Sequence, residues 1–261
     1  MARPSERNTQ PASLRDRRGG APAWRGAALG AALLVLAAGC APRPLLARAI
    51  RARGGPLHGL VEEIEARVHV GAPGTWQWQR AFLFPDRYAW VITTATEPDA
   101  YLFDGSVVRA YIGTRAVSVD RNPAAPLRSH ARWTAVVNLD ALALPGVAVA
   151  PLASSELPAG AREGLAVVFA DDGARYRLAF DERTLLVAAA GPLDLSPITS
   201  GDVTARFADF RRAGGLLLPF ETTYARADTP LAEEHVRAAC PDPPGLGPEA
   251  FVAPDRLPRC P

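Results

Sequence analysis

The chain contains no lysine and only one methionine, although it carries 29 basic residues. All of them are arginine, which indicates a GC-rich genome rather than a nucleic-acid-binding protein, since nucleic-acid binding needs a concentrated basic patch. The sequence also lacks a G-x-S-x-G nucleophile motif and a phosphate-binding glycine loop. Its four histidines are scattered, and none has metal-ligand spacing or lies beside a cysteine pair. We therefore expect a protein that is not an enzyme, with no catalytic residue, no metal site, no cofactor and no nucleic-acid partner.

The neighbouring acidic residues do not indicate acid–base catalysis either. Asp171 and Asp172 precede Gly173 between two expected strands, where Asp-Asp-Gly is typical of a turn. Glu62, Glu63 and Glu65 are interpreted as a solvated strand edge or helix end.

A comfortable membrane-crossing segment is missing as well. The uncharged segment 26–40 is shorter than the roughly 20 residues that a transmembrane helix needs. Six arginines precede it and small residues end it, which is the organisation of a secretory signal peptide. A permanent transmembrane helix is the weaker interpretation.

The end of this segment, Leu36-Ala37-Ala38-Gly39-Cys40, resembles a bacterial lipobox. In lipoproteins with this motif the signal is cut before the cysteine, whose sulfur takes a diacylglycerol. The resemblance predicts lipidation of Cys40, and Ala41 after it favours the outer membrane, facing the periplasm. An ordinary signal peptide followed by a chance cysteine is the alternative.

Cleavage before Cys40 would change the charge and the cysteine count. The 29 basic and 27 acidic residues fall to 23 and 25, a net charge of −2, once the leader's six arginines, Glu6 and Asp16 are removed. With Cys40 lipidated, Cys240 and Cys260 remain as an even pair that could form a disulfide in an oxidising compartment. Two free thiols are the alternative.

Alternating apolar and polar residues dominate the rest of the chain. From Glu62 onward the pattern predicts roughly nine to eleven short antiparallel strands, a spacing typical of sandwiches and barrels. Residues 44–53 suit a short helix or a tether. Ser129–Leu144 is predicted as a helix capped by Ser129, with Trp133 in its apolar stripe. An inserted helix suggests a curved sheet with the helix against its concave face.

Large aromatic residues gather on two adjacent expected strands. Their alternation places them on one sheet face, either as a packed core or as the lining of a pocket covered by the helix near Trp133. Arg80 lies among them and is a candidate polar contact at a pocket mouth, or else faces solvent. The candidate lining residues are Trp76, Trp78, Phe82, Phe84, Tyr88, Trp90, Ile92, Trp133, Tyr176 and Leu178.

Several of these stretches together resemble the LolA/LolB-like superfamily of lipoprotein carriers and acceptors. The similarity covers residues from about Leu57 to Ala238 and is carried by four motifs in order. They are Phe82-Leu-Phe-Pro-Asp-Arg-Tyr-Ala-Trp90, Tyr101-Leu-Phe-Asp-Gly-Ser-Val-Val-Arg-Ala-Tyr111, Phe180-Asp-Glu-Arg-Thr184 and Phe207-Ala-Asp-Phe-Arg-Arg-Ala-Gly-Gly-Leu-Leu-Leu-Pro-Phe220. The soluble carrier has an arginine where this chain has Phe84, and it is not lipidated, so neither strict carrier nor strict acceptor function transfers.

The resemblance implies an α+β, mostly antiparallel fold: an unclosed half-barrel with a helical lid over an apolar cavity. The expected organisation is a signal peptide (1–39), a lipidated N-terminus with a tether or short helix (40–56), the half-barrel (57–239) and a proline-rich tail with the cysteine pair (240–261).

Two functions are compatible with this fold. The first is an envelope lipoprotein that binds or transfers lipid or lipoprotein acyl chains. The second is a structural or assembly lipoprotein that binds other envelope proteins. A pocket of roughly 300 Å³ or more lined by Trp76, Trp78, Phe82 and Tyr88 would favour the first, and a solid interior the second.

Overall fold

The computed structural model describes residues 42–71, 73–93, 99–118, 124–194 and 201–261. The N-terminal segment with the predicted signal peptide and Cys40 lies outside these ranges. Among the described residues, no helix combines the length and apolar character that a membrane crossing requires.

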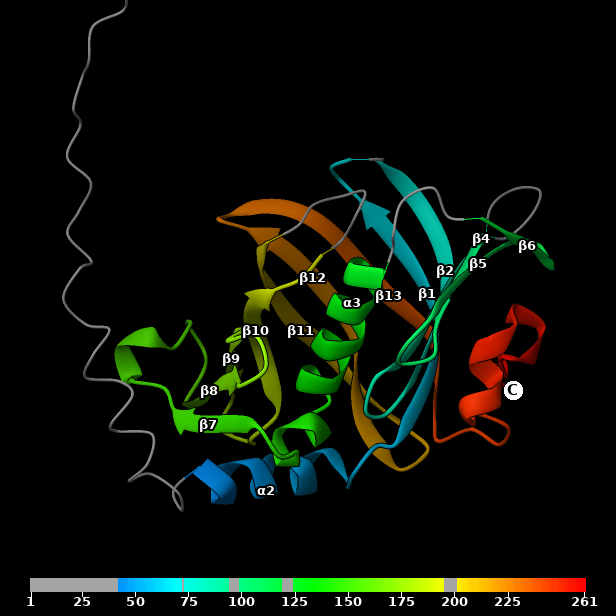
Figure 1. The fold of residues 1–261 in the computed structure, drawn as a ribbon. Helices are drawn as coiled ribbons and strands as arrows, with labels where there is room; N and C mark the ends of the chain where they lie inside the picture. Colours follow the sequence, from blue (N-terminus) through cyan, green and yellow to red (C-terminus); the bar gives the residue numbers. More distant parts are fainter. Residues whose placement is uncertain (1–41, 72, 94–98, 119–123, 195–200) are drawn as a thin grey trace, which may run out of the picture. The chain divides into compact units, whose positions relative to one another are not determined.

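A single antiparallel sheet of thirteen strands forms the body of the protein, in the order β6-β5-β4-β3-β2-β1-β13-β12-β11-β10-β9-β8-β7 (Figure 1). The strands are β1 (Gly59–Val68), β2 (Gly74–Leu83), β3 (Arg87–Thr93), β4 (Asp99–Phe103), β5 (Val108–Ile112), β6 (Arg115–Val117), β7 (Val147–Pro151), β8 (Glu163–Phe169), β9 (Arg175–Phe180), β10 (Leu186–Pro192), β11 (Asp202–Ala213), β12 (Leu216–Arg226) and β13 (Thr229–Pro241). Within the described part, β6 and β7 are the two edges and do not pair with each other, so the sheet is the unclosed half-barrel that the sequence predicted.

The sheet curves around helix α3 (Ala124–Val137), as the interrupted strand pattern suggested (Figure 1). The helix starts five residues earlier than predicted, because Pro126 lies in its first turn, where a missing N–H costs no helical hydrogen bond. Ser129 is therefore not its cap; the Ser129 hydroxyl accepts a hydrogen bond of 2.9 Å from the Asp194 backbone N–H. The helix also ends earlier, and a 3₁₀ turn, η1 (Asp140–Ala143), follows it.

Helix α2 (Pro42–Arg53) precedes the sheet and packs through Leu45, Leu46 and Ala49 into the main core. It ends at Arg53 and is followed by Gly54, whose φ of 113° favours glycine and whose α-carbon faces the β11–β12 turn. A Cβ at this position would lie 2.7 Å from the Gly215 carbonyl oxygen, so the close approach of α2 to this turn requires a glycine.

The C-terminal tail covers the convex face of β1–β5, on the side of the sheet away from α3 (Figure 1). Its short turns η3 (Pro248–Val252) and η4 (Pro254–Arg256) place Phe251 against the sheet with no exposed surface. The remaining short turn, η2 (Ser154–Glu156), follows β7. The sequence predicted an irregular tail but gave no sign that it would complete a second core.

Strand β1 is consequently buried on both faces at its start. Val61 faces the tail on the convex side, and Glu62 faces the concave side with only 6% of its surface exposed. The prediction of a solvated Glu62 is wrong, because the curved sheet turns this side chain inward. Strand β7 was not predicted at all, since its five residues carry only two β-branched side chains.

Candidate functional site: the concave face beneath α3

Helix α3 presents one apolar side to the concave face of the sheet. Leu127, Ala131, Ala135 and Val136 are each at most 3% exposed, and the spacing of four residues between the first three places them along one stripe, with Val136 beside it. They pack with the sheet residues of two core clusters. The helix therefore occupies the position of a cover over the half-barrel.

The aromatic residues of β2 and β3 share the concave face, as their alternation predicted. The register pairs Trp78 with Ile92, Arg80 with Trp90 and Phe82 with Tyr88. The rings of Trp78 and Trp90 meet edge to face, with centroids 5.4 Å apart.

These side chains are mostly packed core rather than the walls of a large pocket. Trp78, Phe82 and Tyr88 are at most 7% exposed, and Trp78, Tyr88 and Trp90 border a void of only about 20 Å³. Trp76, Phe84 and Ile92 are half-buried. Leu178 is fully buried in β9, and Tyr176 on the same strand lies 6.2 Å from Trp133 between ring centroids.

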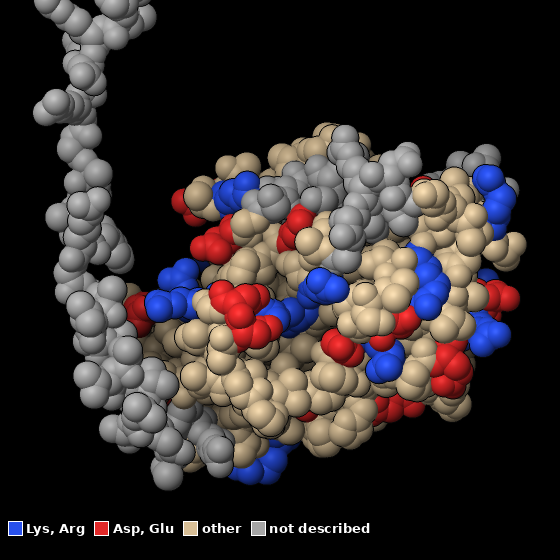
Figure 2. Space-filling model, in the orientation of Figure 1, with Lys and Arg blue, Asp and Glu red and all other residues tan. Residues whose placement is uncertain are grey.

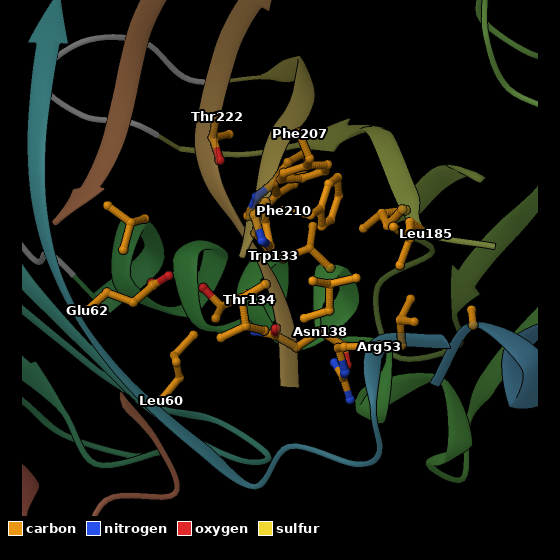
Figure 3. A pocket seen from close by; sticks show the side chains of 18 of the residues that line it. Arg53, Leu60, Glu62, Trp133, Thr134, Asn138, Leu185, Phe207, Phe210 and Thr222 are labelled. Carbon is orange, nitrogen blue, oxygen red and sulfur yellow. The ribbon is translucent and has the colours of Figure 1, made fainter. Parts of the chain in front are cut away.

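A larger cavity, of about 80 Å³, lies further along α3, between the helix and strands β1, β11 and β12 (Figure 3). Trp133 and Val137 of the helix border it, opposite Phe207 and Phe210 of β11. Phe210 follows Asp209, which has a left-handed backbone with φ of 51° and is the one residue between Thr204 and Ala213 without a partner in the β11–β12 register. The cavity is smaller than the 300 Å³ that we set for a preformed acyl site, so by that criterion the interior is nearly filled.

Glu62 and Arg80 line this cavity and belong to a buried charge network on three neighbouring strands. Arg80 Nε donates to Glu62 Oε2 at 2.7 Å, and Arg80 Nη1 donates to Glu234 Oε2 at 3.1 Å. The Tyr224 hydroxyl donates to the same Glu234 oxygen at 3.2 Å. Burial raises the pKa of Glu234, and the charge of Arg80 opposes that shift.

Arg80 is thus placed on the cavity wall, but it is not a free cation at a pocket mouth. Its side chain is 16% exposed and is already bonded to two carboxylates. The sequence could not show this pairing, since Glu62 and Glu234 are 18 and 154 residues away from Arg80.

His130 connects α3 to the aromatic face. Its Nδ1 lies 3.4 Å from the Tyr88 hydroxyl, and its ring stacks near those of Tyr88 and Trp90. Burial lowers the pKa of His130 to about 4, with a further lowering from the Arg80 charge and an opposing effect of Asp194. The imidazole is therefore neutral near pH 7, which suits its aromatic surroundings.

An open groove of about 810 Å³ runs along the other side of α3. Its lining includes Phe103, Leu144, Phe169 and Tyr176. Figure 2 shows basic and acidic side chains side by side around a hollow on this face.

An ion-pair cluster joins α3 to the β8–β9 turn at this groove. Arg132 pairs with Asp171 at 2.5 Å and also with Asp172, and its guanidinium lies 4.5 Å from the Phe169 ring centroid. Asp171 and Asp172 thus form the expected turn and, in addition, hold the helix cover.

The C-terminal end of α3 is held by helix α2. Arg53 donates to the Asn138 backbone carbonyl and to Asp140 Oδ2 at 3.2 Å, although only 7% of Arg53 is exposed. Arg53 of α2 thus lines the cavity and also contacts the segment at the end of α3.

Cys240 and Cys260 are joined by a disulfide in the structure. Among the described residues, no group of three or more His, Cys, Asp and Glu side chains lies close enough together to hold a metal ion.

No protein-family model and no curated protein matches the sequence. A DUF1329 family protein from Desulfovibrio piger is similar in structure, with a TM-score of 0.54 at 12% identity over 82% of this chain and 98% of that chain. A LolA superfamily protein from Nitrosomonas europaea matches with a TM-score of 0.48 at 13% identity over 80% and 96% of the two chains. A domain from Vibrio parahaemolyticus, provisionally described as an outer membrane lipoprotein-sorting protein, has a TM-score of 0.49 at 9% identity over 79% and 94%. At these identities the likeness concerns the fold alone.

Proposed function

We propose that this protein is an envelope lipoprotein, anchored through Cys40, that binds or hands on an acyl-bearing hydrophobic ligand in its half-barrel. The observation that carries the proposal is the cavity between α3 and the concave face, whose walls are formed largely by apolar side chains (Figure 3). Binding needs no covalent step, because each methylene removed from water contributes about 0.8 kcal/mol.

The cavity must enlarge to hold an acyl chain. Ligand pockets usually measure about 300–1,000 Å³, and this one measures about 80 Å³. We infer that the structure is the closed form and that α3 moves away from the sheet on loading. The polar contacts of Arg132, Ser129 and Arg53 surround the helix and would break in turn during such a movement.

A non-catalytic assembly lipoprotein is the second candidate. It is favoured by the tight packing of Trp78, Phe82 and Tyr88, which leaves little space on the aromatic face. On this reading α3 is a permanent part of the core, and the protein would bind other envelope proteins through its rim.

The experiment that separates the two uses the Cys40→Ser protein, exported in soluble form and purified without detergent. Co-purified lipid is measured by native mass spectrometry and organic extraction, and uptake of diphenylhexatriene, an apolar fluorescent probe without a head group, is titrated. A carrier should contain lipid or take up the probe in a one-to-one ratio.

Adjacent residues of β12 give a matched pair of variants. Thr222 lines the cavity and is buried, whereas Thr223 is exposed on the opposite face. Thr222→Phe should fill the cavity and abolish uptake, and Thr223→Phe should leave it unchanged. If the protein contains no lipid and takes up no probe, the carrier proposal is rejected and the assembly lipoprotein is the remaining candidate.

A further inference from the structure

The cavity beneath α3 has an unusual distribution of polarity. Figure 3 shows Glu62 on one side of it and Leu185 with Phe210 toward the other. The charged and hydroxyl-bearing wall of Glu62, Thr134 and Tyr224 is buried. In contrast, the apolar residues Val137, Leu186, Phe210 and Leu217 are only partly buried. The partly buried part of the lining is thus mostly apolar, whereas Glu62 lies among fully buried lining residues that include Leu60, Leu218 and Val236.

The buried wall is a poor device for stability alone. Removing charges from water is costly, and replacing a buried ion pair by apolar residues of similar size is often neutral or stabilising. A ligand pocket, however, typically combines apolar walls with a few convergent polar groups that fix the ligand's orientation. Glu62 and Arg80 of the Glu62–Arg80–Glu234 cluster have that position in the cavity wall.

The composition of this cluster determines the head group that it fits. It contains two carboxylates for one guanidinium, and Arg80 already donates to both of them. An anionic head group would find no uncommitted cation there and would approach Glu62 with a like charge. A hydroxyl or amine could instead donate to the Glu62 carboxylate and exchange hydrogen bonds with the hydroxyl groups of Thr134 and Thr222, which also line the cavity.

We propose that the ligand is a single-chain amphiphile with a hydrogen-bond-donating head group, a hydroxyl or an amine, which enters head first and places that group at Glu62. Its chain then lies along Val137, Phe210 and Leu217 toward the opening. This inference rests on the proposed function and adds the chemical class of the ligand and its orientation.

Three amphiphiles with the same dodecyl chain test the proposal on the Cys40→Ser protein. Dodecanol is titrated below its solubility limit, and dodecylamine and dodecanoate below their micelle-forming concentrations, against bound diphenylhexatriene. We expect dodecanol and dodecylamine to displace the probe at concentrations at least about tenfold lower than dodecanoate, a difference of about 1.4 kcal/mol. This comparison needs no change in the cavity, so it remains decisive if a cavity variant fails to fold.

Neighbouring glutamates of β1 supply the matched variants. Glu62→Gln, which keeps the side-chain shape but removes the charge, should reduce the preference for dodecylamine over dodecanoate to less than about threefold. Glu63→Gln should retain it, because Glu63 is exposed.

The possible failures are distinguishable. Tighter binding of dodecanoate, equal binding of all three amphiphiles, or a preference that survives in Glu62→Gln would overturn this inference while leaving an acyl-binding function intact. If neither the probe nor any amphiphile binds, the proposed function itself is rejected together with the inference.

Discussion

Arg80 on β2 donates a hydrogen bond of 3.1 Å to Glu234 on β13, although β1 lies between these two strands. The arginine reaches across the concave face because Glu62 on β1 accepts from its Nε on the way. One guanidinium thereby links side chains of three strands that are adjacent in the sheet.

Replacing Arg80 with methionine should cost about 3–5 kcal/mol of unfolding free energy, because it leaves two buried carboxylates without a counter-charge. Urea denaturation at neutral pH measures the loss. The triple variant Glu62→Gln, Arg80→Met, Glu234→Gln should recover most of it, since no buried charge then remains. A loss in Arg80→Met of less than about 1 kcal/mol, typical of an exposed pair, would contradict the assignment.

His130 should make the fold sensitive to mild acid. Its pKa is lowered from 6.5 to about 4, chiefly by burial and secondly by Arg80. The unfolded chain therefore takes up the proton first as pH falls. The stability that the neutral ring contributes is complete above about pH 6.5 and is lost progressively down to about pH 4. At pH 4.5 the loss of unfolding free energy relative to neutral pH is roughly 2–3 kcal/mol.

The His130→Phe variant tests this dependence, because it keeps an aromatic ring beside Tyr88 and Trp90 but cannot titrate. Urea melts at pH 7 and pH 4.5 should show a smaller stability loss in the variant than in the parent protein. Glu234, whose pKa is raised, acts in the opposite direction in both proteins and so cancels in the comparison. Identical pH dependence of the two proteins would show that His130 is not buried in its neutral form.

Phe251→Ala should destabilise the protein by about 3–5 kcal/mol, because it opens a cavity in the second core on the convex face. The ring has no exposed surface and packs in one cluster with Val61, Ala81 and Leu102. Arg259→Ala, at an exposed position of the same tail, is the control and should change little. A small effect of Phe251→Ala would mean that the tail is not required for the half-barrel to fold.

The cysteine pair should also contribute to stability. Cys240 and Cys260 are separated by 20 residues, and closing a loop of that size is expected to stabilise by roughly 3 kcal/mol. The variant Cys240→Ser, Cys260→Ser should lower the unfolding free energy by about that amount, and a reductant should affect the parent protein alone. Intact mass after thiol alkylation without reduction checks the premise, since a bridged pair takes up no reagent.

Arg132→Ala should make α3 easier to displace. Its ion pairs with Asp171 and Asp172 are partly exposed, so the global loss should be only about 0.5–1 kcal/mol. Hydrogen exchange of α3 amides should nevertheless accelerate by about threefold to fivefold, together with uptake of diphenylhexatriene. Arg128→Ala, at an exposed position one turn earlier, is the control. Unchanged exchange would argue that the Arg132 cluster does not retain the helix.

Much of the fold follows from local patterns. Alternation places Trp78, Arg80 and Phe82 on one face of β2, and the Asp-Gly and Pro-Asp turns delimit the hairpins, because period-two alternation and turn chemistry act over a few residues. The helix between two blocks of strands predicted the cover. Cys40 and its lipidation were also read from sequence alone, and they remain a prediction.

The tertiary structure decided what these residues do. Arg80 pairs with a carboxylate of the protein rather than with a ligand. Its partner Glu234 lies 154 residues away in sequence and meets Arg80 only because β13 pairs with β1. The cavity lies beside Phe207 and Phe210 rather than between Trp78 and Trp90, because α3 fills the space against β2 and β3. Alternation specifies which face a side chain occupies, whereas the partner it meets there is set by strand pairing and packing over long sequence distances.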